Sequence, residues 1–335
     1  MDAWSAEPVF HEGSLEGVCV LVTGGAGFIG SHLVAYLLEH GAFVRVLDNL
    51  ATGKLQNVKR FRDHPRFEFQ QGDIRNFEDC CRACTGMSFV LHQAAIPSVT
   101  RSVSDPLTTH QVNCDGFMHM LLAARQAGVR RLVYASSSSV YGDAQQLPMK
   151  EEYIGRPLSP YAVSKLTNEL FAEVFMKNYG MELIGLRYFN VFGPRQDPEN
   201  PYAAVIPRFL HALRQGQQPI IYGDGMQSRD FTYVSNAVQA NIKAMLTQNQ
   251  QALGSVFNVA CGESHSVLRL FDLMKQLMLQ AGYAIPSSLT PQHHPPRQGE
   301  IRHSQADINR ARQLLGYQPT VLLEEGLRRL IRCLT

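Results

Sequence analysis

The sequence contains no apolar run long enough to cross a bilayer, although 45% of its 335 residues are hydrophobic. Residues 1–17 have neither the basic leader nor the apolar stretch of a signal peptide. Basic and acidic residues nearly cancel, at 31 against 29, so no surface for nucleic acid or membrane lipid is expected. We therefore predict a cytoplasmic protein without nucleic-acid or membrane partners, in which residues 1–16 form a flexible extension.

The seven cysteines do not form a disulfide or zinc framework. Cys80, Cys81 and Cys84 crowd into EDCCRACTG, but no second pair of ligands follows at the spacing of a zinc finger. Buried thiols on a helix are the favoured interpretation. His293 and His294 lie in the proline-flanked segment TPQHHPPRQ, which we interpret as a solvated loop. We assign no metal site.

Strand-like apolar runs and helical stretches alternate through the first half of the chain. Such alternation predicts a parallel sheet wrapped by helices. After residue 187, proline, glycine and asparagine become frequent and the expected elements shorten. We expect residues 188–230 and 261–335 to form a smaller mixed α/β lobe, with returns to the sheet around 231–260. The strand-like runs are VCVLVT, FVRVLD, RFEFQ, SFVLHQAA and RRLVYASS.

A glycine-rich segment, TGGAGFIG at 23–30, connects the first expected strand to the first expected helix. It fits GxGxxG as Gly25, Gly27 and Gly30, and GxxGxxG with Gly24 in place of Gly25. Glycines at these positions let a pyrophosphate approach the helix N-terminus, where free N–H groups attract it. Together with the alternation, the segment predicts a Rossmann-type doubly wound parallel sheet over residues 17–187 that binds a dinucleotide.

Asp48 ends the second expected strand and is the carboxylate expected to bind the adenosine ribose hydroxyls. A carboxylate there repels a 2′-phosphate, which favours NAD over NADP; Arg45 would weigh against this if its side chain lay beside Asp48. Asp73 in QGDIR allows two interpretations that the sequence leaves open. It either accepts from the adenine amine or caps the helix that begins near NFEDC.

The stretch SPYAVSK places Tyr161 and Lys165 four residues apart, directly after a proline that suits a helix start. The pair is either an ordinary surface pair or a phenol whose pKa the ammonium lowers for proton transfer. The run from Ser136 to Ser139 ends a strand at the sheet edge where ligands bind. A serine, a tyrosine and a lysine beside NAD are the groups needed for hydride transfer at a carbinol carbon.

These motifs together resemble the extended short-chain dehydrogenase/reductases, and within them the nucleotide-sugar 4-epimerases. The resemblance covers the chain from Val18 to the C-terminus and is greatest to the bacterial UDP-N-acetylglucosamine 4-epimerases. The motifs that carry it are TGGAGFIGSH, LDNLATG, GDIR, HQAA, SSSSVYGD, SPYAVSK, RYFNVFGPRQDP, YGDGMQSRDFTYV and GEIRHSQAD.

The resemblance implies a role for each matched residue. Tyr161 would be the general base, Lys165 would lower its pKa and hold the nicotinamide ribose, and Ser137 would bind the reacting hydroxyl. The implied cofactor-binding residues are Gly24, Gly27, Phe28, Ile29, Gly30, Asp48, Asn49, Asp73, Ile74, Gln93, Ala94, Tyr161, Lys165 and Tyr188. The implied UDP-sugar-binding residues are Ser98, Ser137, Ser138, Asn190, Arg229, Arg297 and Ser304.

The implied reaction is redox-neutral. Tyr161 would take the O4 proton while C4 gives hydride to NAD, and the resulting 4-keto sugar would receive the hydride on its opposite face. The cofactor should therefore stay tightly bound. Ser304 stands where the family has its sugar gate, and a small residue there favours an N-acetylated sugar, so UDP-GlcNAc and UDP-GalNAc are the expected pair. Pro97 departs from the glycine of the family pattern, and a uronic-acid or a non-acetylated substrate stays open.

Three other functions compete with the epimerase. A 4,6-dehydratase needs carboxylates after the catalytic hydroxyl, and a UDP-glucuronate decarboxylase typically has a glutamate there; this chain has Ser138 and Ser139. A non-catalytic NAD sensor would commonly lose the tyrosine or the lysine, and both are present. Helices expected at about 106–127 and 161–179 are apolar beyond a single stripe, which favours a homodimer built from two helices per subunit.

Overall fold

The computed structural model describes residues 8–197, 204–296 and 301–334 of the chain. Its centre is a seven-stranded sheet in the order β11-β6-β5-β4-β1-β2-β3, and every neighbouring pair is parallel. The chain order runs outward in both directions from β1 and β4, so the carboxyl ends of these two strands flank the switch point where such sheets bind ligands. The strands are β1 (Cys19–Thr23), β2 (Phe43–Asp48), β3 (Phe67–Gln71), β4 (Phe89–His92), β5 (Arg131–Ser137), β6 (Glu182–Tyr188) and β11 (Val256–Val259).

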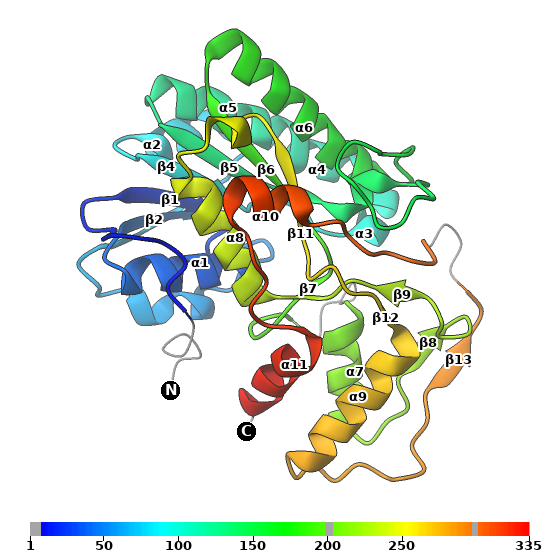
Figure 1. Cartoon of the computed structure of the whole chain (residues 1–335). Helices are drawn as coiled ribbons and strands as arrows, with labels where there is room; N and C mark the ends of the chain where they lie inside the picture. Colours follow the sequence, from blue (N-terminus) through cyan, green and yellow to red (C-terminus); the bar gives the residue numbers. More distant parts are fainter. Residues whose placement is uncertain (1–7, 198–203, 297–300, 335) are drawn as a thin grey trace.

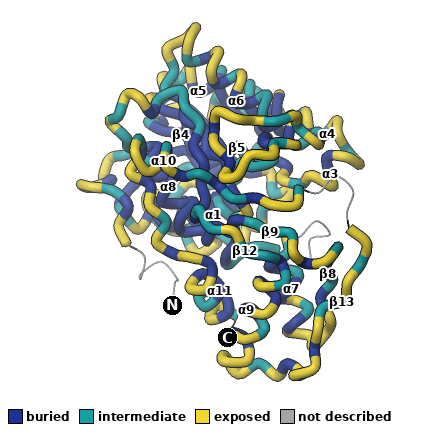
Figure 2. Tube along the Cα trace, turned by 45° about the vertical axis from the view of Figure 1, so that its right-hand side comes forward, coloured by how far each residue is buried: buried dark blue, intermediate teal, exposed yellow. Residues whose placement is uncertain are grey.

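Helices cover both faces of this sheet, as a doubly wound fold requires (Figure 1). The central strands are apolar nearly throughout because both of their faces are buried; Figure 2 shows β4 and β5 among the buried elements. One face carries α1 (Phe28–Glu39), α8 (Val234–Leu246) and α10 (Asn309–Leu315), and the other carries α2 (Phe77–Cys84), α5 (Gly116–Gln126) and α6 (Pro160–Tyr179). The prediction of a Rossmann-type parallel sheet is confirmed.

A smaller lobe packs beside the carboxyl end of the sheet around its own apolar core (Figure 1). Besides its helices, the lobe contains three two-stranded sheets, in which β7 pairs with β10, β8 with β13 and β9 with β12. Its elements are β7 (Val191–Phe192), α7 (Val205–Arg214), β8 (Ile220–Tyr222), β9 (Ser228–Arg229), β10 (Thr232–Tyr233), β12 (His265–Ser266), α9 (Val267–Gln280), β13 (Gln292–His294) and α11 (Leu323–Arg332).

In the structure, the helix expected at 106–127 is divided into three consecutive helical segments. Its middle turn is a π-helix, η3 (Gln111–Asp115), between α4 (Pro106–His110) and α5. A further helix, α3 (Val99–Ser104), precedes α4, and both lie against α6. The remaining short 3₁₀ segments are η1 (Leu55–Asn57), η2 (Lys59–Phe61), η4 (Ser138–Tyr141) and η5 (Gln250–Ala252).

Three expectations about the organisation of the chain need correction. Residues 8–16 are anchored to the large domain at two points rather than loose, because Phe10 and Leu15 are buried and the Phe10 N–H donates to the Tyr36 hydroxyl at 2.8 Å. Helix α10 lies in a segment expected in the small lobe but packs on α8 and β11 of the large domain. His293 and His294 belong to strand β13 rather than to a loop.

No helix among the described residues is both long and apolar enough to span a membrane. Cys80 and Cys84 are buried on α2, as expected for structural thiols, and burial raises the pKa of each. Within the described ranges, no three histidine, cysteine or acidic side chains converge in a way that could hold a metal ion.

Candidate active site

The glycine segment between β1 and α1 is closed by backbone contacts that leave no room for side chains. A Cβ at Gly24 would lie 2.8 Å from the backbone nitrogen of Ala94, and a Cβ at Gly30 would lie 2.2 Å from the Gly24 carbonyl oxygen. Gly24 also has a φ of +66°, which L side chains rarely adopt. Gly27 is the N-cap residue directly before α1 and has no side chain to cap the helix, so the first-turn N–H groups suit a pyrophosphate.

Asp48 lies at the carboxyl end of β2 and anchors the loop that follows. Its carboxylate accepts hydrogen bonds from the backbone N–H of Ala26 at 2.9 Å and of Leu50 at 2.8 Å. Burial raises the pKa of Asp48, and these two hydrogen bonds oppose the rise. A carboxylate has about four acceptor positions, so two remain for ribose hydroxyls.

Arg45 does not face Asp48. Residues 45 and 48 lie on opposite sides of β2 because side chains alternate along a strand. The Arg45 guanidinium pairs with Glu68 at 2.9 Å and donates to the Thr85 carbonyl oxygen at 2.7 Å. Arg45 is therefore not placed to bind a 2′-phosphate beside Asp48, and it does not weigh against NAD.

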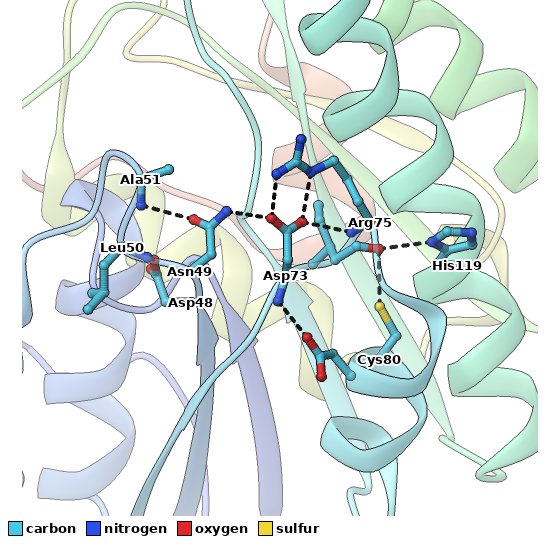
Figure 3. Close-up of polar contacts among 10 residues, drawn as sticks. Asp48, Asn49, Leu50, Ala51, Asp73, Arg75, Cys80 and His119 are labelled. Atoms are coloured by element: carbon cyan, nitrogen blue, oxygen red, sulfur yellow. Dashed lines mark hydrogen bonds and ion pairs between the residues drawn. The ribbon is translucent and has the colours of Figure 1, made fainter.

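Asp73 lies at the carboxyl end of β3 and faces the segment after β2 (Figure 3). Its carboxylate accepts from the Asn49 amide at 2.8 Å and pairs with Arg75 at 2.7 Å. Arg75 is the main reason that the pKa of Asp73 is lowered to about 2. Asn76, not Asp73, caps α2, so the helix-cap interpretation is wrong. Arg75 is a site residue that was not expected, although its position two residues after Asp73 was the available signal.

The surface-pair interpretation of SPYAVSK is also wrong. Helix α6 begins at Pro160, and the Ser159 hydroxyl accepts from the Ala162 N–H at 3.1 Å. Lys165 is only 3% exposed, and its Nζ donates to the Ala135 carbonyl oxygen on β5 at 2.8 Å. Burial lowers the pKa of Lys165 to about 8. This lysine is therefore an interior cation at the sheet edge.

Tyr161 is half-buried one turn before Lys165. Burial raises the pKa of its phenol, and a hydrogen bond with the Ser137 side chain opposes the rise. The Lys165 Nζ lies 6.0 Å from the centre of the tyrosine ring. In the protein alone, burial therefore outweighs the groups that would lower the phenol pKa. Ser137 lies at the end of β5 and also accepts from the Ser139 N–H at 3.1 Å.

Two expected cofactor residues, Gln93 and Tyr188, belong to a closed ring of hydrogen bonds. The Tyr188 hydroxyl donates to the Gln93 side chain at 3.0 Å, and Gln93 donates to Asn241 at 3.1 Å. Asn241 completes the ring by donating to the Tyr188 hydroxyl at 2.7 Å. Asn241 comes from α8 and was missed; its only signal is a buried polar residue in an apolar helix. The ring connects β4, β6 and α8 at the edge where the glycine segment lies.

Several expected substrate residues gather where the small lobe meets the sheet. The Asn190 side chain donates to the Asp230 carbonyl oxygen at 3.0 Å. Arg229 donates to the carbonyl oxygens of Ser228 and Arg302 at 2.9 and 3.2 Å. Ser304 is buried, and its N–H also donates to the Ser228 carbonyl oxygen, at 3.0 Å. Asn190, Arg229 and Ser304 are thus brought together.

The other expected substrate residues differ in their surroundings. The Ser98 hydroxyl accepts from the Arg101 N–H at 3.1 Å and so caps α3. Ser138 begins η4 directly after Ser137. Arg297 lies outside the described residues.

Comparison with known proteins identifies the family. The family described as GDP-mannose 4,6 dehydratase matches residues 21–330. The chain belongs to this family. A UDP-glucose 4-epimerase of Mycolicibacterium smegmatis is 38% identical to it over 314 residues, covering 92% of this chain and 95% of that protein.

Solved structures agree with this assignment. A UDP-N-acetylglucosamine 4-epimerase from Methanobrevibacter ruminantium M1, in complex with UDP-N-acetylmuramic acid, superposes with a TM-score of 0.86 at 37% identity, covering 95% of this chain and 98% of that chain. A UDP-glucose 4-epimerase from Thermus thermophilus, in complex with NAD, gives a TM-score of 0.82 at 36% identity, covering 94% and 98%. The predictions of an extended short-chain dehydrogenase/reductase and of an NAD-using nucleotide-sugar 4-epimerase are confirmed at the level of the family.

Proposed function

We propose that this protein is an NAD-dependent UDP-hexose 4-epimerase that interconverts UDP-GlcNAc and UDP-GalNAc. The observation that carries the proposal is the grouping of Tyr161, Ser137 and buried Lys165 at the same edge of the sheet as a glycine segment that suits a pyrophosphate. Epimerases among the relatives support the reaction class. UDP-N-acetylhexosaminuronate and UDP-glucose or UDP-galactose are the alternative substrates, and the experiment below distinguishes them.

The side chains of this protein would share the work of binding and proton transfer. Bound NAD would supply the acceptor for the C4 hydride and later return it. Ser137 would orient the O4 hydroxyl toward Tyr161, whose phenolate oxygen would take the proton and give it back. Lys165 would hold a positive charge near this site, because a pKa of about 8 leaves its amine mostly protonated at neutral pH, and the Ala135 carbonyl oxygen fixes the position of that amine. Asn190 and Arg229 would hold the diphosphate while the sugar turns over.

The residues after Ser137 disfavour the dehydratase and decarboxylase alternatives. The dehydratase needs acid and base carboxyl groups directly after the catalytic hydroxyl, and the decarboxylase typically has a glutamate there, whereas this chain has Ser138 and Ser139. The Ser139 hydroxyl is buried without a hydrogen-bond partner among the described residues. A serine hydroxyl cannot serve as the carboxylate base that eliminates water or assists loss of CO₂. Epimerisation needs no such group.

The proposed function can be tested with purified protein, UDP-GlcNAc and no added NAD, following the anomeric protons by NMR. We expect UDP-GalNAc to form up to a constant equilibrium ratio, because the cofactor is retained and the reaction is redox-neutral. Conversion of UDP-glucose or of a UDP-hexuronate, without conversion of UDP-GlcNAc, would overturn the substrate. A 4-keto-6-deoxy product or released CO₂ would overturn the reaction class.

We expect Ser304→Tyr to exclude N-acetylated substrates. Ser304 is 6% exposed, and its backbone is held by the Ser228 carbonyl oxygen and the Ser264 hydroxyl, so under the proposal a larger side chain would narrow the space for the sugar. The value of kcat/KM for UDP-GlcNAc should fall at least about tenfold, whereas UDP-glucose should be affected less. Ser288→Tyr, at an exposed position of the same lobe, is the matched control. Equal losses for both sugars would contradict Ser304 as the gate.

We also propose that a second copy of the chain packs on α6 and its neighbours. Val163, Leu170 and Val174 share one face of α6, and Leu107 on α4 lies beside that helix; all four are about half exposed or more. An apolar patch of this kind is typical of a protein interface. Leu170→Asp should convert a dimer into a monomer by light scattering, while Leu279→Asp, at an exposed leucine of α9, should not. A monomeric parent protein would refute the interface.

A further inference from the structure

Asp230 is a fully buried carboxylate in the short turn between β9 and β10. Its surroundings are backbone N–H groups rather than a cation. One oxygen accepts from the Cys261 N–H at 2.9 Å, and the other accepts from the N–H groups of Gly262 at 3.0 Å and Ala306 at 3.2 Å. No ion pair to Asp230 is found in the described part of the chain. Burying a charged carboxylate is costly unless hydrogen-bond donors satisfy it. The three backbone donors supply that compensation, so the carboxylate holds the segments that carry them in one arrangement.

The three donors come from two segments that are distant in the sequence. Cys261 and Gly262 follow β11, whereas Ala306 lies two residues after Ser304. A second bond joins the same segments, because the Gln305 side chain donates to the Gly262 carbonyl oxygen at 2.9 Å. Asp230 therefore fixes the position of the segment that carries the expected sugar gate.

The backbone of Asp230 reaches the other expected substrate contacts. Its carbonyl oxygen accepts from the Asn190 side chain at 3.0 Å, and the preceding residue is Arg229. The Ser304 N–H bonds to the Ser228 carbonyl oxygen, which also accepts from the Arg229 guanidinium. One residue thus connects the two expected diphosphate contacts with the gate. Asparagine could not fully replace Asp230, because its side chain has only one acceptor oxygen. Its NH₂ group would face at least one of the three backbone N–H groups, and two donors cannot form a hydrogen bond.

Burial raises the pKa of Asp230 to about 7, and the three backbone N–H groups oppose the rise. The carboxylate itself is fully buried, so any effect of Asp230 on a nucleotide sugar would have to pass through Asn190, Arg229 and Ser304. The residues expected to bind the cofactor, such as Asp48 and Lys165, belong to other elements of the structure.

We propose that Asp230 is a positioning residue that holds the diphosphate contacts and the sugar gate in one arrangement, and that it controls nucleotide-sugar affinity without controlling cofactor retention. The inference rests on the proposed function, because it assigns the substrate to these three contacts. It adds a residue that is not expected to touch the substrate.

The test measures UDP binding by calorimetry, NAD content by absorbance after denaturation, and the rate of UDP-GlcNAc conversion. Asp230→Asn should raise the Kd of UDP at least about tenfold. It should raise the KM for UDP-GlcNAc in parallel, with kcat changed less than about threefold, and leave NAD content unchanged. Asp272→Asn, at an exposed position of α9 in the same lobe, is the control and should change none of these.

Gln305→Ala is the second variant, because it removes only the bond between the same two segments. It should raise the Kd of UDP in the same direction by a smaller factor, and it decides the question if Asp230→Asn does not fold. An unchanged Kd in a folded Asp230→Asn, or in Gln305→Ala when the first variant is unfolded, overturns the proposal. Parallel loss of NAD also overturns it. If the parent protein binds UDP but does not convert UDP-GlcNAc, only the proposed substrate is contradicted. The measurement of UDP binding does not depend on turnover and still tests the role of Asp230.

Discussion

Tyr161→Phe should lower the turnover of UDP-GlcNAc by about 10²–10⁴-fold, the usual contribution of a positioned acid–base group. Phenylalanine retains the half-buried ring and removes only the oxygen that meets Ser137. The fold and the NAD content should therefore be unchanged. The rate is measured by NMR with the parent protein and the variant at equal concentration, and NAD content by absorbance after denaturation.

Tyr179→Phe provides the matched control for this experiment. Tyr179 lies at the exposed end of the same helix, α6, where its ring faces Arg125 rather than the sheet edge. Its hydroxyl should be dispensable, so turnover should stay close to that of the parent. If Tyr161→Phe kept more than about a tenth of the parental rate, another group would have to take the O4 proton.

The phenol of Tyr161 is not activated by its protein neighbours alone. Lys165 directs its Nζ to the Ala135 carbonyl oxygen, and the desolvation of Tyr161 outweighs the effect of Ser137 on the phenol pKa. The i,i+4 spacing correctly placed the two residues on one face of a helix, but spacing cannot say where a long side chain ends. The direction of the lysine depends on β5, which lies 30 residues earlier in the chain.

The cofactor half of the site could be predicted from the sequence because its signals are local. The strand, the glycine segment and α1 follow one another within residues 19–39, and Asp48 ends the next strand. The fit of Gly24 against Ala94 and of Gly30 against Gly24 then explains why glycine is needed at these positions. Elements that follow one another directly in the chain can be predicted from the hydrophobic pattern and from the turn residues.

The substrate half was predicted less completely, because its contacts join distant segments through backbone groups. Asp230 binds N–H groups 31 and 76 residues further along the chain, and any residue except proline offers such a donor. Asn241 was missed for a related reason, since its partner Gln93 lies 148 residues away. Helix α10 returns to the large domain for packing reasons that its own sequence does not display.

Arg187→Met should lower the free energy of unfolding by about 3–5 kcal/mol, because it leaves a buried carboxylate without its cation. Arg187 on β6 pairs with Glu169 on α6 through two bonds of 2.8 and 2.9 Å, and the side chains are 3% and 8% exposed. The free energy is obtained from urea titrations at pH 7. Arg328→Met, which breaks the exposed pair with Glu324 on α11, should cost no more than about 0.5 kcal/mol.

The double variant Arg187→Met with Glu169→Leu separates the cost of an unpaired charge from the loss of the pair. Replacing both members of a buried pair by apolar groups is often nearly neutral, so the double variant should be more stable than Arg187→Met. If the double variant were as unstable as Arg187→Met, the unpaired charge would not be the main cost. The loss of the other hydrogen bonds of these two side chains would then account for most of the instability. These bonds run from Ser136 to Glu169 and from Arg187 to the Glu151 carbonyl oxygen.

The position of the pair connects stability with the active site. Glu169 lies one turn after Lys165 on α6, and Ser136, which donates to Glu169, directly precedes Ser137 on β5. Glu169 therefore holds α6, the helix of the base, against β5, the strand of the orienting serine, through Ser136, and Arg187 holds Glu169 in place. If this is its role, the double variant should fold and still lose turnover, because Tyr161 and Ser137 would no longer be held in one geometry. A folded double variant with parental turnover would restrict the pair to stability.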